Sequence, residues 1–251
     1  MTEKSRFTSD RRVPRESSWA GESDWVAGVA EDVDAIGGRL VGRSPKQYSE
    51  SLDSTIYNFE DGEWSGDWTD ESQSASGIKI SDSRAYDGAY SLVVSSNPGT
   101  STACRARSIS SWLGSNKYRL YLNKYADGGG HNSHRFQLLN RSNTSQQLYI
   151  SASSYSTPYV TLQERDATGS IINTWVLKNS TDTPRGGWFE MSIDVRGPDT
   201  VIATVDGASV GVTPDADWTG IDVQIEISAN GWGGGHKMYT AADNVEVKPS
   251  E

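Results

Sequence analysis

Apolar and polar side chains alternate along most of the chain from Ile56 onward. Residues 221–227 read Ile-Asp-Val-Gln-Ile-Glu-Ile, and residues 189–195 repeat the alternation around Phe189 and Met191. A period of two places successive side chains on opposite faces of a strand, so each run predicts an antiparallel strand with one buried face and one polar face. The signal recurs in shorter segments: Tyr118, Leu120 and Leu122; Phe136 and Leu138; Leu148 and Ile150; Val160 and Leu162.

Turn-forming residues separate these runs. Such stretches occur at residues 97–99, 127–130, 167–169, 197–199 and 206–207, each containing glycine. Strands separated by glycine and proline turns, roughly a dozen of them and without a convincing helical pattern, are typical of a two-sheet sandwich. The sequence therefore predicts an all-β, antiparallel sandwich over residues 56–251.

Residues 1–55 differ, being polar and charged without regular alternation. Within them Trp25, Val29 and Val33 recur every four residues, which favours a short helix, whereas Arg39-Leu40-Val41 could equally be a short strand. A segment this polar cannot bury enough apolar area to fold alone. We therefore expect an extended or partly helical N-terminal arm that serves as an assembly anchor.

The charge is acidic, with 33 Asp and Glu against 23 Lys and Arg and a formal net charge of −10. Nonspecific nucleic-acid binding needs a basic surface, so no nucleic-acid partner is expected. Asp outnumbers Glu 20 to 13 and Arg outnumbers Lys 15 to 8. This bias favours a protein that works in concentrated salt, although an ordinary acidic β-protein could share it.

Other features bear on the cellular setting. The apolar runs are too short to cross a membrane, so no membrane insertion is expected. Cys104 is the one cysteine and cannot close an internal disulfide. The first residues lack the apolar core of a signal peptide, which predicts synthesis in the cytoplasm.

The order of several segments resembles the concanavalin A-like, laminin-G-like jelly roll and related carbohydrate-binding modules. Tyr57 to Gly62 is similar to the first strand of that fold, and Tyr86 to Val94 to the strand that follows. Gly187 to Glu190 with Val201 to Gly207 resembles the central hairpin, and Ala242 to Val247 the last strand, which pairs back near the first. The resemblance implies a jelly-roll sandwich.

The same resemblance implies a structural calcium ion. In many such modules the acid after the first-strand Phe and the Asp of the last strand bind one ion, which corresponds here to Glu60 and Asp243, with Asp61 as a further ligand. Calcium prefers carboxylate and carbonyl oxygens. The alternative is that these carboxylates lie at solvated strand ends and bind nothing.

Catalysis is not expected from the motifs. Glycosidases built on such sandwiches carry two acids on one strand face, typically in an E-x-D-x-x-E pattern, which this sequence lacks. Glu190 and Asp194 share a strand face, but four residues apart they are more simply its polar side. The chain also lacks a G-x-S-x-G elbow, a P-loop and an HExxH helix.

Aromatic residues near the predicted loops are candidates for a glycan site. They are Trp232, Tyr155, Tyr159 and Tyr125. A sugar ring stacks its apolar face on Trp or Tyr while polar neighbours bind its hydroxyls. The alternative is that these rings pack on a neighbouring subunit or cover the open end of the sandwich.

These observations together predict a virion surface protein, either a capsid turret or decoration or a tail fibre or spike, resembling structural proteins of tailed viruses of halophilic archaea. It would be a homo-oligomer, contact other virion proteins through residues 1–55, and attach to a host-surface glycan or glycoprotein without catalysis. A carbohydrate-binding module or glycosidase-like protein of a halophile is the alternative, and a decoration protein without ligand a third.

Overall fold

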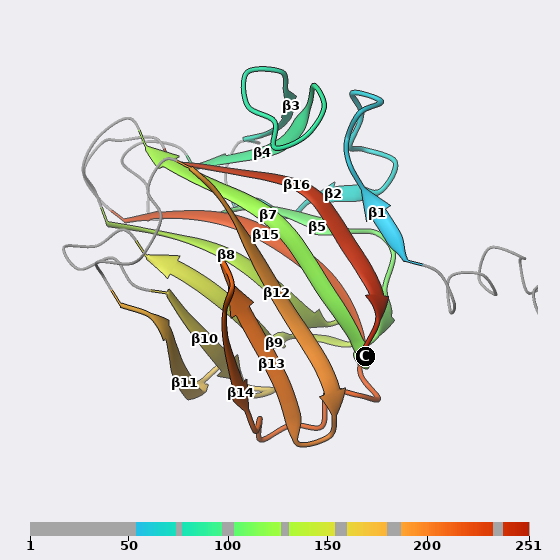
Figure 1. Ribbon diagram of the computed structural model, residues 1–251, viewed down its shortest axis with the longest axis vertical. Coiled ribbons are helices and arrows are strands. Elements are labelled where there is room, and N and C mark those ends of the chain that lie inside the picture. The colour runs from blue at the N-terminus through green and yellow to red at the C-terminus, as the bar shows by residue number, and fades with distance from the viewer. Residues whose placement is uncertain are drawn as a thin grey trace, which may run out of the picture. The chain divides into compact units, whose positions relative to one another are not determined.

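The computed structural model describes residues 54–73, 77–96, 103–126, 131–153, 160–179, 187–232 and 238–250. These residues form sixteen strands and no helix, so the predicted all-β class is confirmed for them (Figure 1). None of their elements is a helix long and apolar enough to span a membrane. The predicted N-terminal arm lies outside the described residues.

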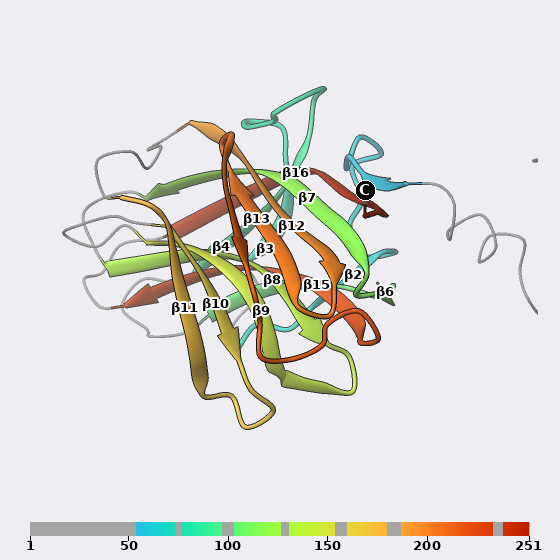
Figure 2. The same cartoon turned by 60° about the horizontal axis from the view of Figure 1, so that its bottom comes forward.

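The strands form two antiparallel sheets, as predicted, and each has eight strands (Figures 1 and 2). In sheet A, the long strands β7 and β12 lie side by side with β16. Its order is β14 (Ala208–Val212), β13 (Thr200–Val205), β12 (Trp188–Gly197), β7 (Asn116–Ala126), β16 (Met238–Pro249), β4 (Ser91–Ser96) and β3 (Ile78–Ser81), and β1 (Thr55–Tyr57) also pairs with β16.

Sheet B contains the segment with the clearest alternation, residues 221–227, at the start of its central strand β15. Its order is β11 (Ile171–Lys178), β10 (Val160–Arg165), β9 (Asn143–Ser153), β8 (His131–Asn140), β15 (Asp222–Trp232), β5 (Ala103–Ser108) and β2 (Trp68–Asp70), and β6 (Trp112–Leu113) also pairs with β15.

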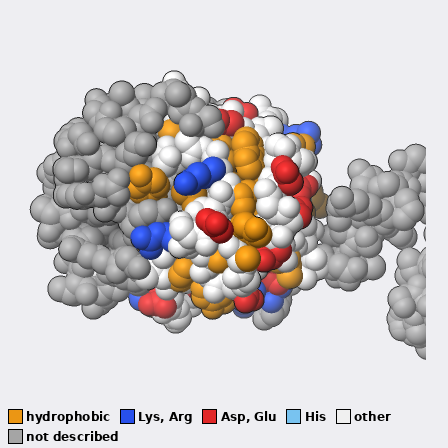
Figure 3. Space-filling view, turned by 90° about the horizontal axis from the view of Figure 1, so that it is seen from above, with side chains coloured by type: hydrophobic (Ala, Val, Ile, Leu, Met, Phe, Trp, Pro, Cys, Tyr) orange, Lys and Arg blue, Asp and Glu red, His pale blue; other side chains and the backbone are white. Residues whose placement is uncertain are grey.

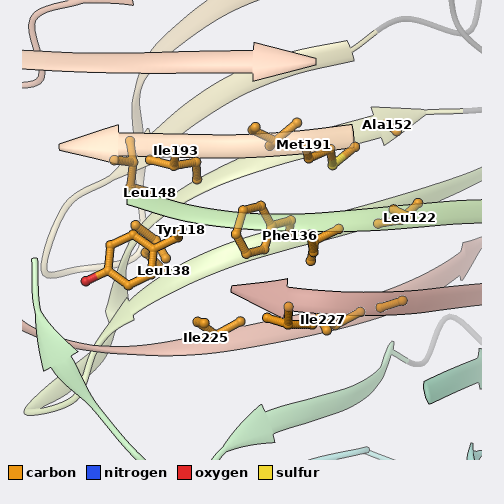
Figure 4. Close-up of a cluster of buried hydrophobic side chains, with 14 of the residues drawn as sticks. Tyr118, Leu122, Phe136, Leu138, Leu148, Ala152, Met191, Ile193, Ile225 and Ile227 are labelled. Carbon is orange, nitrogen blue, oxygen red and sulfur yellow. The ribbon is translucent and has the colours of Figure 1, made fainter. Parts of the chain in front are cut away.

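The core lies between the inner faces of the two sheets and contains the apolar residues that the alternation selects (Figure 4). Phe136 and Leu138 from β8 are completely buried, as are Met191 and Ile193 from β12. Cys104 is also buried and free. Burial of each large apolar side chain contributes about 1.5–3 kcal/mol, so these facing rows hold the sheets together.

The segments that carry the family resemblance follow the expected connectivity. The central hairpin is β12–β13, and the last strand pairs with the first, with Thr55 opposite Val247. Two strands are shorter than the sequence predicts. β1 ends at Tyr57, and β4 begins only at Ser91, because residues 59–62 and 86–90 form turns.

Candidate functional site

Glu190 and Asp194 lie on the outer face of sheet A, as their spacing on β12 predicts. Their partners differ. The Glu190 carboxylate is 3.7 Å from Arg119 and accepts a hydrogen bond from Tyr121 at 3.4 Å. Asp194 instead pairs with Arg196 at 2.7 Å. The structure therefore assigns these acids separate ion pairs and supports the interpretation that they form the polar side of the strand.

An aromatic cluster that the sequence did not reveal lies on the same face. Tyr86 stacks on Tyr121 with ring centroids 3.7 Å apart, and its ring also meets Trp188 edge-on at 5.9 Å. A hydrogen bond with Tyr86, together with partial burial, raises the pKa of Tyr121 to about 12. Tyr86 is itself 44% exposed, so this cluster offers a rival surface for stacking a sugar ring.

The four aromatic residues predicted to bind glycan are only partly within the described structure. Tyr125 belongs to β7 and pairs with Tyr239, whereas Trp232 is the last residue of β15 and pairs with His131. Tyr155 and Tyr159 lie outside the described residues. The glycan role of these four residues stays a prediction.

The predicted calcium ligands Glu60 and Asp243 both contact the turn at residues 86–90. The Glu60 carboxylate accepts hydrogen bonds from the backbone N–H groups of Ala89 and Tyr90 at 2.9–3.0 Å. Asp243 accepts them from Tyr86 and Asp87 at 2.9 and 3.2 Å. Burial raises the pKa of Asp243, and the nearby Glu60 charge adds to that effect.

The backbone around this turn is locally strained. Phe59, which precedes Glu60, and Asn244, which follows Asp243, have positive φ angles of 61° and 47°. Such angles are uncommon for residues other than glycine and persist only where the surroundings impose them. These two residues lie next to the carboxylates that bind the turn at residues 86–90. The turn therefore connects the start of the sandwich segment, at Glu60, with its last strand, at Asp243.

The donor set fits a calcium ion only in part. Asp61 accepts a hydrogen bond from the Glu63 N–H at 3.0 Å, a local turn contact. The described residues contain no group of three or more His, Cys, Asp or Glu side chains suited to a metal. Backbone N–H groups already donate hydrogen bonds to the Glu60 and Asp243 carboxylates, so calcium stays a prediction, with Asp243 as its most buried ligand.

A more distinctive site lies on the outer face of sheet B, which we call the polar face. Its described residues come from neighbouring strands and carry long hydrogen-bonding side chains, although several are buried. Glu226 is 1% exposed, Gln137 2% and Tyr149 0%. The members used below are Arg105 and Arg107 (β5), Arg135 and Gln137 (β8), Tyr149 (β9), Gln163 and Arg165 (β10), Glu226 and Ser228 (β15), and Glu71 beside β2.

Glu226 lies at the centre of this face and is held from both sides. The guanidinium of Arg107 donates to Glu226 Oε2 from Nη2 at 2.7 Å and from Nε at 3.1 Å. Gln137 Nε2 donates to the other oxygen, Oε1, at 2.7 Å. Because both oxygens are bound to well-packed donors, the orientation of this carboxylate is fixed before any ligand arrives.

A second carboxylate lies on the same guanidinium. Glu71 Oε2 is 3.6 Å from Arg107 Nη1, and the Glu71 side chain is 42% exposed whereas that of Glu226 is 2% exposed. The Glu71 N–H donates to the Arg105 carbonyl, which extends the β2–β5 pairing by one residue. Arg107 therefore places one buried and one exposed acid beside each other.

The opposite side of the polar face is cationic. Arg135 packs over the Tyr149 ring, 4.9 Å from its centroid, and Arg165 Nε donates to the Tyr149 hydroxyl at 3.2 Å. The Tyr149 hydroxyl in turn donates to Gln163. Burial lowers the pKa of Arg135, and repulsion from Arg165 and Arg105 adds to that effect.

The sequence does contain a signal for this site. Pairs of polar residues two apart, such as Arg105 and Arg107 or Arg135 and Gln137, occur where the alternation predicts an ordinary solvent-facing side. Their common feature is that long hydrogen-bonding side chains occupy these positions in several adjacent strands. Which strands are adjacent follows from the sheet order, so the cluster becomes visible only in the fold.

Comparison with solved structures now gives the fold a name. A β-glucanase from Bacillus licheniformis superposes with a TM-score of 0.56 at 14% identity, over 78% of this chain and 97% of that one. A Bacteroides ovatus GH16 protein in complex with a G4G4G3G product gives 0.59 at 12% identity, over 77% and 99%. The chain has a concanavalin A-like jelly-roll fold. The Crh5 transglycosylase gives 0.55 at 13% identity, over 80% and 86%.

Sequence comparison adds nothing to this assignment, because no protein-family model and no curated protein matches the chain. The jelly-roll resemblance drawn from the sequence is confirmed at the level of the fold. Nothing in the comparisons points to a virus or to a halophilic archaeon.

Two expectations are corrected by these similarities. The chain was expected to be a virion surface protein, with turret, decoration or tail-fibre roles, and to lack catalysis. The structures that share its jelly roll are instead a glucanase, a GH16 protein with a glucan product and a transglycosylase. The missing two-acid strand motif was taken to exclude catalysis. The acidic composition, the polar N-terminal segment and the missing signal peptide were taken to indicate a virion protein.

Proposed function

We propose that the protein is a polysaccharide-cleaving or transglycosylating enzyme whose active site is the polar face of sheet B. The observation that carries this proposal is the arrangement of Glu226 and Glu71 at the two ends of the Arg107 guanidinium. The printed activities of proteins with the same fold support the reaction class. This agrees with the alternative considered from the sequence, a glycosidase-like protein.

Glycosidic bond cleavage needs two carboxyl groups, one that protonates the leaving oxygen and one that acts as nucleophile or activates water. Glu226 suits the second role, because Arg107 and Gln137 fix both of its oxygens in one orientation. Glu71 suits proton transfer, because its partly exposed side chain can exchange protons with solvent. Glu226 belongs to β15 and Glu71 follows β2, so the two acids do not form a motif within one strand.

The polar face also suits the binding of an extended sugar chain. It crosses several adjacent strands, and its side chains offer amide, hydroxyl and guanidinium groups that bind hydroxyls on successive sugar rings. Gln137, for example, donates to Ser228 as well as to Glu226, at 3.3 Å. A network of this kind is already oriented, so little side-chain ordering is needed when a glycan binds.

The test is release of reducing ends from a panel of neutral and acidic polysaccharides by the full chain. Wild type should cleave or transfer at least one member, and Glu226→Gln and Glu71→Gln should each reduce kcat by about 100-fold or more. Glu190→Gln is the matched control, since it changes the same residue type on the outer face of sheet A, and it should retain full turnover. Absence of turnover on every substrate, or equal loss in the Glu190 variant, would contradict the proposal.

A further inference from the structure

The polar face has an excess of positive charge, although the whole chain has a net charge of −10. Four arginines, Arg105, Arg107, Arg135 and Arg165, face two glutamates among the described residues of this face. Both glutamates contact Arg107, and no ion pair joins Arg135 or Arg165 to a carboxylate within the described part of the chain. Figure 3, which views the molecule from above relative to Figure 1, shows acidic, basic and hydrophobic side chains interspersed among the described residues.

Arg135 carries the strongest sign of a missing partner. Its Nε is buried and has no hydrogen-bond partner within the described structure. An unpaired buried donor on a charged group loses its hydration without replacement, so such groups are normally satisfied. Tyr149 below the guanidinium offers only its ring face, and Arg165 and Arg105 repel it.

Arg165 approaches the same tyrosine from the neighbouring strand. Its Nε is bound to the Tyr149 hydroxyl, and its Cζ is 5.6 Å from the ring centroid, against 4.9 Å for Arg135. Two guanidinium groups are therefore held against one buried ring. Arg165 already donates from Nε to Tyr149 and from Nη1 to the Gly169 carbonyl, whereas Arg135 Nε has no acceptor in the described part of the chain. An anion bound beside the two guanidinium groups would accept a hydrogen bond from Arg135 Nε and reduce their mutual repulsion, and a carboxylate or a sulfate suits this equally.

This anion position lies beside the proposed reaction centre. Arg135 precedes Gln137, the residue that binds Glu226, by two positions on β8, which is about 7 Å along a strand. We propose that the polysaccharide recognised by the polar face is acidic, with a carboxylate or a sulfate ester on a sugar that Arg135 and Arg165 bind. This inference names the substrate class of the proposed enzyme and rests on that proposed function.

The test is calorimetric binding of three hexasaccharides at low salt: a polyuronate, a sulfated galactan and a neutral β-glucan. The polyuronate or the sulfated galactan should bind at least about tenfold more tightly than the neutral glucan, and which of the two does so identifies the anion. Arg135→Gln and Arg165→Gln should each lose about tenfold in affinity for that ligand and less than about twofold for the glucan.

Two further variants keep the result interpretable. Arg135→Lys retains the charge without the planar fork and should lie between wild type and Arg135→Gln. Arg141→Gln removes an exposed arginine that pairs with Asp222, six residues along β15 from Ser228, the strand partner of Arg135, and it should bind like wild type. Thermal melts of each variant establish that the fold is retained.

The outcomes separate the two proposals. Equal binding of neutral and acidic hexasaccharides, with no loss in the Arg135 and Arg165 variants, would overturn the anion site even if the enzyme cleaves neutral glucan through Glu226. Arginine-dependent binding of an acidic hexasaccharide that is never cleaved would confirm the anion site and would count against the proposed catalysis.

Discussion

Arg107 donates two hydrogen bonds to the same oxygen of Glu226, Oε2, at 2.7 and 3.1 Å, between the paired strands β5 and β15. The Glu226 side chain is 2% exposed and that of Arg107 15% exposed, so this is a nearly buried ion pair. Removal of either partner leaves the other charge poorly compensated, and such losses are larger than those of surface pairs.

A double-mutant cycle on this pair should therefore show strong coupling. Arg107→Gln and Glu226→Gln are each expected to lower the free energy of unfolding by about 2–4 kcal/mol. The double variant should lose less than the sum of the two, with a coupling energy of about 1–3 kcal/mol, measured by urea denaturation. Strict additivity would mean that the two side chains do not depend on each other.

Glu164 is a second buried carboxylate, on the inner face of β10, and we predict a structural role for it. Its two oxygens accept four hydrogen bonds, from the backbone N–H of Asp215 and Ala216 and from the side chains of Trp218 and Asn173. Glu164→Gln would direct an NH₂ group at two of these donors and should cost about 2–4 kcal/mol of stability. The measurement is a denaturant titration, and a loss below about 0.5 kcal/mol would contradict this role.

A side chain at Gly88 should displace the Glu60 carboxylate from the turn at residues 86–90. Its φ angle is +72°, and a Cβ atom would lie 2.5 Å from the Glu60 carboxyl carbon. Gly207 has a similar φ of +80° but open space around it, so Gly207→Ala measures the backbone strain alone. Gly88→Ala should lower the melting temperature more than Gly207→Ala does, and equal shifts would show that the contact with Glu60 is unimportant.

Titration of Asp243 should make the stability of the folded protein depend on pH. Because burial raises its folded-state pKa above the unfolded value of about 3.8, the folded state binds the proton more tightly. Stability from this group is therefore present at low pH and is lost as the pH rises from the unfolded pKa through the folded one. Asp243→Asn cannot titrate, so its stability should decline less over that window.

Calcium addition tests the predicted metal at the same position. Calcium should raise the melting temperature of wild type at pH 7, raise it less at pH 4, because the raised pKa of Asp243 favours its protonated form, and leave Asp243→Asn nearly unchanged. A melting temperature at pH 7 that is the same with calcium and with a chelator would refute the calcium prediction.

The sequence was sufficient to predict the fold class because the alternation of apolar and polar residues can be recognised within each strand. Phe189, Met191 and Ile193 alternate with polar residues, and this period alone assigns them to the core of a sheet. The resemblance also placed Ala242 to Val247 beside the first strand, which the pairing of β16 with β1 confirms.

The candidate site could not be predicted in the same way, because its residues come from strands that are far apart in the sequence and become neighbours only in the folded sheet. Glu226 and Arg107 are 119 residues apart, and their contact depends on β15 pairing with β5. Alternation presented Glu226 as one more solvent-facing residue, whereas in the fold it is 1% exposed and is bound by Arg107 and Gln137. A search for two acids on one strand therefore missed Glu71 and Glu226, which come from different strands.

Glycan binding on the polar face of sheet B is tested most directly by hydrogen–deuterium exchange with the tightest-binding hexasaccharide. The ligand should slow exchange in β5, β8 and β15, around Arg107, Gln137 and Glu226, and Glu226→Gln should retain this protection. Protection confined to the segments around Tyr86, Tyr121 and Trp188, on the outer face of sheet A, would contradict glycan binding on the polar face.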